Sequence, residues 1–294
     1  TALVPTNDYM FVEGKAIGLV RGFVSEGFYT VNDFRYENGQ YILKEGIPDI
    51  TKALTATYMH PFNIPNGQTA FPGAAKFRDV NNSGTVDLDD ATCLGEVMPR
   101  HTGSFQLNFN YKNFDLSSNF NWTAGGKVYN VAAMINASGQ EFDGIGAQRT
   151  SWVADTYKVY NVNSSGDLYA VTDPNELNAL NANAKYHLPY HQSGITSSEW
   201  LEDGSYLRLQ TLTLGYTLPH TVLNKIHIEK LRIYLTATNL FTITGYSGID
   251  PEVNATPTGQ SGFYSNLRVF PTLNMDFGTY PRARTFTLGA NITF

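Results

Sequence analysis

The stretch that decides the fold is residues 101–112, which read HTGSFQLNFNYK. Its apolar and polar side chains alternate strictly, with Phe105, Leu107, Phe109 and Tyr111 on one side and Ser104, Gln106, Asn108, Asn110 and Lys112 on the other. Successive side chains of a β-strand point to opposite faces, so the alternation predicts a strand with one apolar and one polar face. A tight connection at Asn113 follows and the alternation then resumes, which predicts a hairpin.

The same alternation recurs along the chain and predicts five strands, at 102–112, 114–123, 205–218, 230–241 and 284–294. The third strand changes phase near Gln210 and Thr211, which indicates a β-bulge. Ordinary globular strands have about 5–6 residues, whereas roughly 9–11 tilted residues are needed to cross a bilayer. The polar sides are rich in Ser, Thr, Asn and Gln rather than in charges. The strands therefore favour the wall of a transmembrane β-barrel with a wet interior.

Composition agrees with a β-rich surface or membrane protein. Charged residues make up 16% of the chain and aromatic residues 13%, whereas a typical globular chain is about 25% charged. The net charge is −6, and Lys and Arg do not cluster, so a nucleic-acid partner is not expected. The single Cys93 excludes an internal disulfide. A secreted carbohydrate-binding β-sandwich would have a similar composition, so this class stays open.

The connections between the predicted strands differ greatly in length. Two are short, at Asn113 and at 219–229, and two are long, at 124–204 and 242–283. Outer-membrane barrels alternate short periplasmic turns with long extracellular loops. With a periplasmic C-terminus, counting strands backwards places residues 1–101 in an extracellular loop region. Five strands cannot close a barrel and open edges are not viable in lipid, so the remaining strands are expected from elsewhere. No signal peptide begins at Thr1, which we expect of a processed protein or a piece of a longer one.

Several segments stand out along the chain: 12–18 and 22–24 (VEGKAIG and GFV), 77–87 (FRDVNNSGTVD), 200–209 (WLEDGSYLRL), 232–242 (RIYLTATNLFT), 246–252 (YSGIDPE) and 280–289 (YPRARTFTLG). Taken in this order, they resemble the C-terminal third of the SusC/RagA family of TonB-dependent outer-membrane transporters. They are similar to the family's EGxPIG, DxNGDGxID, EDGSYLRL, NLFTxT, YSGxDPE and YPxxRTFTFG patterns. The loop at 124–199 departs most from the family.

The resemblance implies a 22-stranded barrel of which this chain supplies the last five strands. It also implies a receptor that imports glycans or oligopeptides rather than an enzyme. The implied partners are a SusD-like surface lipoprotein that acts as a lid, the N-terminal plug and barrel portion, TonB acting through that portion, and outer-membrane lipid. The family's N-terminal parts have no counterpart in this sequence. The alternative is a secreted, calcium-stabilised carbohydrate-binding β-sandwich.

The segment 79–90 follows the residue order of a calcium-binding loop. Oxygen ligands recur at positions 1, 3 and 5, a glycine stands at position 6, and a carboxylate stands at position 12. These positions map onto Asp79, Asn81, Ser83, Thr85 (through its carbonyl), Asp87 and Asp90, with Gly84 at the turn. Position 12 is Asp rather than the longer Glu, so the loop is closer to a dockerin type than to a full EF-hand. The sequence predicts a structural Ca²⁺; a polar turn without metal is the alternative.

Other constellations predict no chemistry. His187 and His191 are four residues apart, but Pro189 argues against a helix between them, so we expect exposed loop histidines. No nucleophile elbow, phosphate loop or catalytic carboxylate pair is present in the sequence. Loop aromatics could stack on sugars or peptides, although packing within the loops is the expected role; they are Trp152, Tyr157, Tyr160, Tyr246 and Tyr264.

Overall fold

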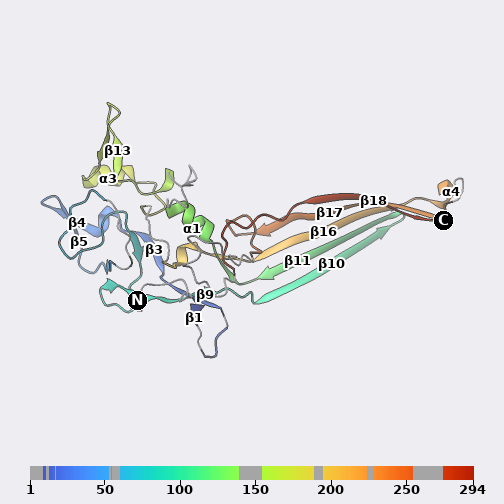
Figure 1. Cartoon of the computed structure of the whole chain (residues 1–294), viewed down its shortest axis with the longest axis horizontal. Helices are drawn as coiled ribbons and strands as arrows, with labels where there is room; N and C mark the ends of the chain where they lie inside the picture. The colour runs from blue at the N-terminus through green and yellow to red at the C-terminus, as the bar shows by residue number, and fades with distance from the viewer. Residues whose placement is uncertain are drawn as a thin grey trace, which may run out of the picture.

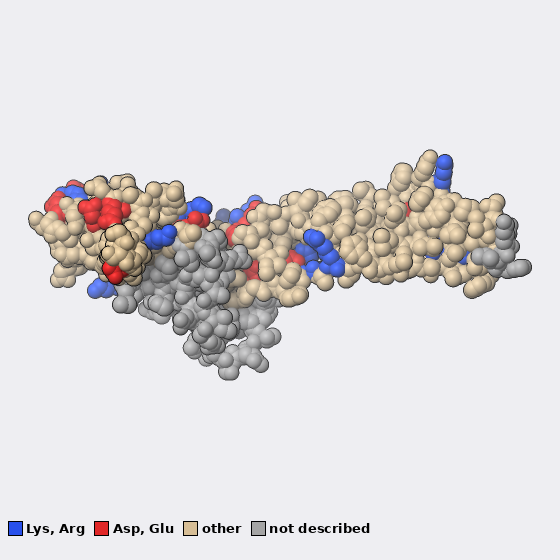
Figure 2. Space-filling view, turned by 90° about the horizontal axis from the view of Figure 1, so that it is seen from above, with Lys and Arg blue, Asp and Glu red and all other residues tan. Residues whose placement is uncertain are grey.

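The computed structural model describes residues 9–10, 13–16, 18–52, 54, 60–138, 154–188, 195–223, 228–253 and 274–294. The molecule is elongated, with a sheet of long strands at one end and a lobe of short strands and loops at the other (Figure 1). The C-terminus lies at the end of the sheet farthest from the lobe (Figure 1). The charges follow this division, because Lys, Arg, Asp and Glu are sparse along the sheet end (Figure 2).

The long sheet contains five antiparallel strands in the order β10-β11-β16-β17-β18. The strands are β10 (His101–Tyr111), β11 (Phe114–Ala124), β16 (Tyr206–Thr217), β17 (Lys230–Thr244) and β18 (Thr285–Thr293). The predicted five-strand wall is confirmed. β17 is longer than predicted, because residues 241–244 continue the pairing with Tyr206–Leu209 of β16.

The predicted bulge lies in β16 at Gln210. The register of β16 shifts between Leu209 and Thr211 against both of its neighbours. A bulge inserts an extra residue into one strand, so the side chains beyond it change phase. Leu207 and Leu209 therefore share a face with Leu212 and Leu214, although the first two positions are odd-numbered and the last two are even-numbered. The change of phase that the sequence shows is thus required to keep one face apolar.

The lobe is built from short paired strands. The pairs are β2 (Leu19–Gly22) with β1 (Tyr9–Met10) and β9 (Thr92–Glu96), β3 (Ser25–Phe28) with β7 (Ala75–Phe77), β4 (Phe34–Glu37) with β5 (Gln40–Leu43), β6 (Asp49–Ile50) with β8 (Thr85–Val86), β12 (Lys127–Tyr129) with β15 (Leu201–Asp203), and β13 (Tyr160–Val162) with β14 (Leu168–Ala170). The β6–β8 pair is parallel. Short helices complete the described part: η2 (Val31–Asp33), η3 (Leu88–Asp90), α1 (Val131–Ser138), α3 (Pro174–Leu180), η4 (Ser198–Trp200) and α4 (His220–Leu223), the last after β16.

Over its described part, the segment 1–101 that the sequence assigned to an extracellular loop region contains short paired strands and buried aromatic side chains. Phe23, Tyr29, Tyr41 and Ile50 are buried in one hydrophobic core together with residues of the 157–195 region, Leu177 among them. The Tyr41 hydroxyl donates to the carbonyl of Thr172 at 2.8 Å, which joins the same two regions. Burial of aromatic side chains is among the largest favourable contributions to folding. The lobe is therefore a packed unit made from two distant parts of the chain.

Polar contacts hold the lobe to the end of the sheet. Glu202 accepts hydrogen bonds from the Asn130 amide at 2.8 Å and from the backbone N–H and hydroxyl of Ser247, each at 2.7 Å. Tyr246 donates to Asp276 at 2.6 Å within the interior. Buried polar groups require such partners, so these contacts fix the segments that leave the long strands.

Within the described ranges, no helix is long and apolar enough to cross a membrane.

Candidate functional site

One face of the long sheet is apolar across all five strands. Residues directly opposite each other in the register point to the same side of a sheet. On this basis the apolar face comprises Phe105, Leu107, Phe109, Tyr111, Phe114, Leu116, Phe120, Trp122, Leu207, Leu209, Leu212, Leu214, Tyr216, Leu231, Ile233, Leu235, Phe241, Ile243, Phe286, Leu288 and Ile292. Phe109 is 63% exposed and Leu288 75% exposed. Most of this face is exposed, whereas Leu209 is buried. An exposed apolar surface of this extent marks contact with lipid or with another protein.

Aromatic side chains occupy both ends of the apolar face. Near the β10–β11 turn, Phe114 lies against Tyr216 with ring centroids 4.6 Å apart. Towards the lobe, Phe105 stacks on Phe120 at 4.8 Å. Trp122 follows, opposite Gly103 in the register. Bands of aromatic residues at the two borders of an apolar zone are typical of transmembrane β-strands.

The opposite face is polar and its side chains bond to one another across the strands. Gln106 donates to Ser117 at 3.1 Å, Asn121 donates to Gln210 at 2.6 Å, and the hydroxyls of Thr213 and Thr236 are 2.9 Å apart. These are neutral amides and hydroxyls, as the sequence predicts. Such a face can be wetted without the desolvation cost of isolated charges.

An ion pair crosses the polar face between β11 and β17. The Arg232 guanidinium donates two hydrogen bonds to the Asp115 carboxylate, at 2.9 Å from Nε and 2.5 Å from Nη2. The pair passes over Gly215 of the intervening β16, where a Cβ would collide with both side chains. In the same cross-strand row, Gly289 makes room for the ring of Tyr234. Large and small residues thus alternate along the row, which lets the paired charges lie close to the sheet.

A second ion-pair cluster lies at the end of the sheet nearest the lobe. Arg208 of β16 is only 2% exposed and donates to Asp250 at 2.6 Å. Its Nη1 lies 3.4 Å from Glu252, and Glu252 also pairs with Arg282 at 2.7 Å. The 246–252 segment is thereby fastened to the polar face of the sheet.

The predicted calcium loop folds into a compact turn around Ser83 and Gly84. Ser83 N–H donates to the side-chain oxygens of Asp79 at 3.0 Å and Asn81 at 2.8 Å, and Gly84 N–H donates to Asp79 at 2.7 Å. The Ser83 hydroxyl donates to the Thr85 carbonyl at 2.9 Å. Four of the predicted ligands therefore converge on the inside of one turn.

The two remaining predicted ligands have structural contacts of their own. Asp87 caps η3 by accepting from Asp89 N–H at 2.9 Å. Asp90 is buried and accepts from the N–H groups of Val80 at 2.8 Å and Asp87 at 2.9 Å. In the described ranges, no group of three or more His, Cys, Asp or Glu residues could hold a metal ion. A cation in this loop would depend on the amide, hydroxyl and carbonyl oxygens as well as the carboxylates.

His187 is not the exposed loop residue that the sequence predicted. It is buried, and its Nε2 lies 3.6 Å from the carboxylate of Glu199 in η4. Burial lowers the pKa of His187 and raises the pKa of Glu199 to about 7. Sequence spacing missed this pair because its members are twelve positions apart. His191 lies outside the described residues.

Two of the loop aromatics pack as expected. Tyr157 and Tyr246 are buried, whereas Tyr160 is exposed on β13. Trp152 and Tyr264 lie outside the described residues.

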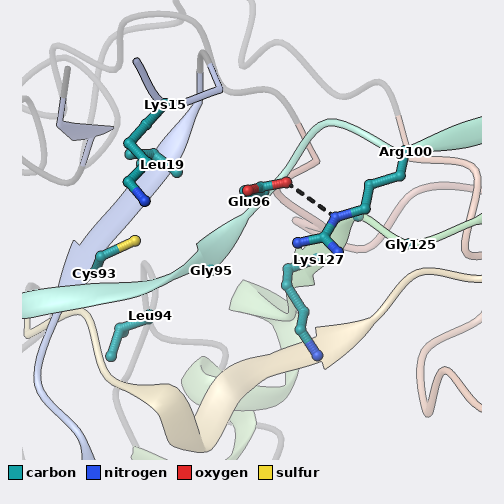
Figure 3. Close-up of a pocket in the computed structure, with 10 residues that line it drawn as sticks. Lys15, Leu19, Cys93, Leu94, Gly95, Glu96, Arg100, Gly125 and Lys127 are labelled. Carbon is teal, nitrogen blue, oxygen red and sulfur yellow. Dashed lines mark hydrogen bonds and ion pairs between the residues drawn. The ribbon is translucent and has the colours of Figure 1, made fainter. Parts of the chain in front are cut away.

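Sequence reasoning also missed a cavity of about 500 Å³ where β2, β9 and β12 meet (Figure 3). Cys93, Glu96, Arg100 and Lys127 line it, and Arg100 donates to Glu96 at 3.3 Å. The Cys93 thiol is exposed. The cavity is formed by segments from separate parts of the chain, so no sequence motif signals it.

No protein-family model matches the chain. It is 28% identical over 282 residues to the TonB-dependent receptor P3 of Formosa agariphila, covering 96% of this chain and 22% of the relative. It is 30% identical over 223 residues to the TonB-dependent receptor P26 of the same organism, covering 76% and 20%. It is 27% identical over 225 residues to the TonB-dependent receptor SusC of Bacteroides thetaiotaomicron, covering 74% and 17%.

The structure is similar to that of the RagAB peptide importer in its open-open state. The TM-score is 0.56 at 18% sequence identity, over 99% of this chain and 24% of the importer chain. The closed-closed state gives a TM-score of 0.51, over 98% and 25%. The chain spans about a fifth of the length of the curated relatives and about a quarter of the solved importer chain.

Proposed function

The chain belongs to the SusC/RagA-like TonB-dependent receptors, and from that premise we propose that it forms the C-terminal wall of an outer-membrane transporter that imports glycans or oligopeptides. The observation that carries this proposal is the sheet with one apolar and one polar face. The apolar face would contact lipid and the polar face would line the interior. The matched relatives are receptors and an importer, so an enzymatic role is not expected.

The lobe fits an extracellular position in this arrangement. It lies at the end of the sheet opposite the C-terminus (Figure 1). A periplasmic C-terminus would therefore place the lobe outside the cell, in reach of a SusD-like lipoprotein lid. A peptide substrate rests on the likeness to the RagAB importer, and a glycan substrate rests on the resemblance to the SusC receptors. TonB and the plug would act through the N-terminal portion of the transporter.

A secreted β-sandwich is not supported. A sandwich buries the apolar side of one sheet against a second sheet. Throughout the described ranges, the long sheet has no second sheet on its apolar face, and Phe109, Leu235 and Leu288 remain exposed.

The test is extraction of native outer membranes in mild detergent, followed by purification through an affinity tag in the exposed β13–β14 hairpin. We expect a complex that contains a polypeptide with a plug and the remaining strands, together with a surface lipoprotein, both identified by mass spectrometry. The complex should migrate faster on unheated gels than after boiling. Recovery of the chain alone from detergent-free buffer would contradict the proposal.

We further propose that the loop 79–90 binds a structural Ca²⁺. Its support is the convergence of Asp79, Asn81, Ser83 and Thr85 oxygens on one turn, with Gly84 at a φ of 85° that favours glycine. Calcium prefers six to eight such hard oxygen ligands. The ion would restrain the polypeptide between β7 and β9.

Calcium binding is tested by isothermal titration of the complete transporter with CaCl₂ after treatment with EGTA. Asp79→Asn should weaken binding, whereas Asp89→Asn should not, because Asp89 is exposed and outside the predicted ligand set. At a free calcium concentration of 100 times the dissociation constant, binding should raise the free energy of opening of the lobe by about 2.7 kcal/mol. Equal calcium binding by the two variants would contradict the proposed ligand set.

A further inference from the structure

A polar cavity of about 300 Å³ lies where β17 runs beyond its neighbour β18. β17 pairs with β18 only as far as Thr238 opposite Thr285, and β17 itself extends to Thr244. The cavity is lined by Arg208, Asn239, Thr242, Asp250, Arg282 and Arg284. Three guanidinium groups thus line one cavity at the lobe-side end of the sheet.

Arg208 reaches this cavity with hydrogen-bonding capacity left over. A guanidinium is always charged and has five N–H donors. Nη2 donates to Asp250, but Nε and Nη1 are buried without a hydrogen-bond acceptor among the described residues. A buried donor left unsatisfied is unfavourable, so the geometry favours an additional acceptor beside Arg208.

Glu252 already bridges two of the three arginines. One carboxylate oxygen is 2.7 Å from Arg282 and the other is 3.4 Å from Arg208 Nη1. The distance to Arg208 is an ion-pair contact, and no hydrogen bond is formed there. Because the Glu252 side chain is 36% exposed, it can be displaced by a ligand from solvent.

The charges of the cluster do not balance. Among the described residues of the cavity, three arginines are opposed by two carboxylates, Asp250 and Glu252, which leaves one positive charge in excess. Among the residues that the structure describes, no carboxylate lies within ion-pair distance of Arg284. Guanidinium groups bind carboxylates and sulfates through paired, charge-assisted hydrogen bonds.

We propose that this arginine cluster binds an oxyanion of the transported substrate, either a carboxylate or a sulfate ester. When substrate is absent, the Glu252 carboxylate pairs with Arg208 and Arg282 instead. The inference rests on the proposed transport function and narrows its substrate class to anionic oligomers. Asn239, Thr242 and Thr244 supply neutral hydrogen-bonding groups beside the charges.

The test uses the complete transporter with its lid lipoprotein, purified in detergent, and isothermal titration with matched probes. Hexagalacturonate is compared with its methyl ester, which keeps the length and removes the charges. Hexaglutamate is compared with hexaglutamine, so that the glycan and peptide sources of a carboxylate are distinguished. A sulfated galactan hexasaccharide and its desulfated form test the sulfate ester. We expect at least one charged probe to bind more tightly than its neutral counterpart.

Two variants with opposite expected effects separate binding from structural roles. Arg284→Gln should weaken binding of the charged probe about tenfold, because it removes an exposed cationic donor. Glu252→Gln should strengthen it, because it removes the competing carboxylate. Arg35→Gln is the control, since Arg35 is an exposed lobe arginine with a long ion pair of 3.9 Å. Unchanged fast migration on unheated gels shows that each variant is assembled.

The inference is overturned if no charged probe binds more tightly than its neutral counterpart, or if both variants bind the charged probe as the wild type does. Tight binding of the neutral probes would contradict the anion site but would remain consistent with the proposed transport function. Failure to find the chain in an outer-membrane complex would instead remove the proposed function itself.

Discussion

At the scale of single residues, glycines on the polar face decide where large side chains can lie. Gly215 leaves space for the Asp115–Arg232 pair and Gly289 leaves space for Tyr234. Alternation in the sequence can assign a residue to a face, but it does not show which side chains lie beside it. Their partners belong to strands separated from them in sequence, so periodicity carries no information about the crowding that requires glycine.

We expect Gly215→Ala to destabilise the sheet by roughly 1–3 kcal/mol, because the added Cβ forces the ion pair to move. The measurement is the urea concentration at which the folded form, seen on unheated gels, is half lost. Gly245→Ala is the control, since a Cβ there meets nothing within 4 Å. Combining Gly215→Ala with Asp115→Ala and Arg232→Ala should remove most of the added cost. A full cost in that background would rule out crowding as the cause.

Glu199 predicts a pH dependence of the lobe. Its pKa is raised by burial from 4.5 to about 7, so the folded lobe holds this proton more tightly than the unfolded chain. The resulting stability is fully present below pH 4.5 and is lost as the pH rises to 7. The Gln side chain of Glu199→Gln does not ionise, so this variant does not lose stability as the pH rises. The difference in free energy of unfolding between the variant and wild type should therefore rise by at most about 3 kcal/mol from pH 4.5 to pH 7.

The measurement is hydrogen exchange at the Ser198 amide, which donates to the Phe23 carbonyl at 2.9 Å, corrected for the intrinsic effect of pH. Burial lowers the pKa of His187, so the folded lobe favours its neutral form. The contribution of His187 to stability is therefore lost as the pH falls below 6.5, opposite to the effect of Glu199. Comparing variant with wild type largely cancels the His187 contribution. Glu45→Gln, at an exposed site, is the control. A pH-independent difference for Glu199→Gln would contradict the assignment.

At the scale of elements, the two faces of each long strand have different requirements. The apolar residues of β10 point away from its polar residues, so neighbours in sequence face different surroundings. Strand length and alternation are local properties, and the sequence predicted them closely, including the bulge at Gln210. The exact ends were missed where pairing continues beyond the alternating pattern, as in residues 242–244 of β17.

Phe109→Arg should impair membrane assembly, because an arginine near the bilayer midplane costs about 2–4 kcal/mol. Leu235→Arg should act alike, since Leu235 is on the same face of β17. Asn108→Arg is the matched control: it adds the same side chain one residue away on the polar face. The measurement is the fraction of each variant that reaches the outer membrane in fast-migrating form. Equal assembly of all three would contradict the assignment of the faces.

At the scale of the whole molecule, the lobe joins two regions that the sequence treated as separate. Residues 23–86 and 157–195 share one core, with Tyr41 and Leu177 as buried members from either side. The sequence assigned residues 1–101 to an extracellular loop region and 124–204 to a long connection, because strands of two to five residues are too short to establish a period. Chain length between predicted strands could not reveal that these regions pack together.

Leu177→Ala should destabilise this shared core by about 2–5 kcal/mol through the cavity that it leaves. We expect faster limited proteolysis of the lobe, while the long sheet keeps its fast migration on unheated gels. Leu168→Ala is the control, because Leu168 is 69% exposed on β14. Loss of sheet assembly together with the lobe would show that the two parts do not fold independently.

The sequence by itself determined the long sheet, its two faces, its bulge and its family resemblance, because alternation with period two is a local property of the strand. It also placed Asp79, Asn81, Ser83 and Thr85 on one turn, since all four lie within seven residues. Only the tertiary structure decided the shared core of the lobe, the His187–Glu199 pair and the arginine cluster. Each depends on contacts between distant segments, such as Arg208 with Asp250, and no local pattern encodes which distant segments meet.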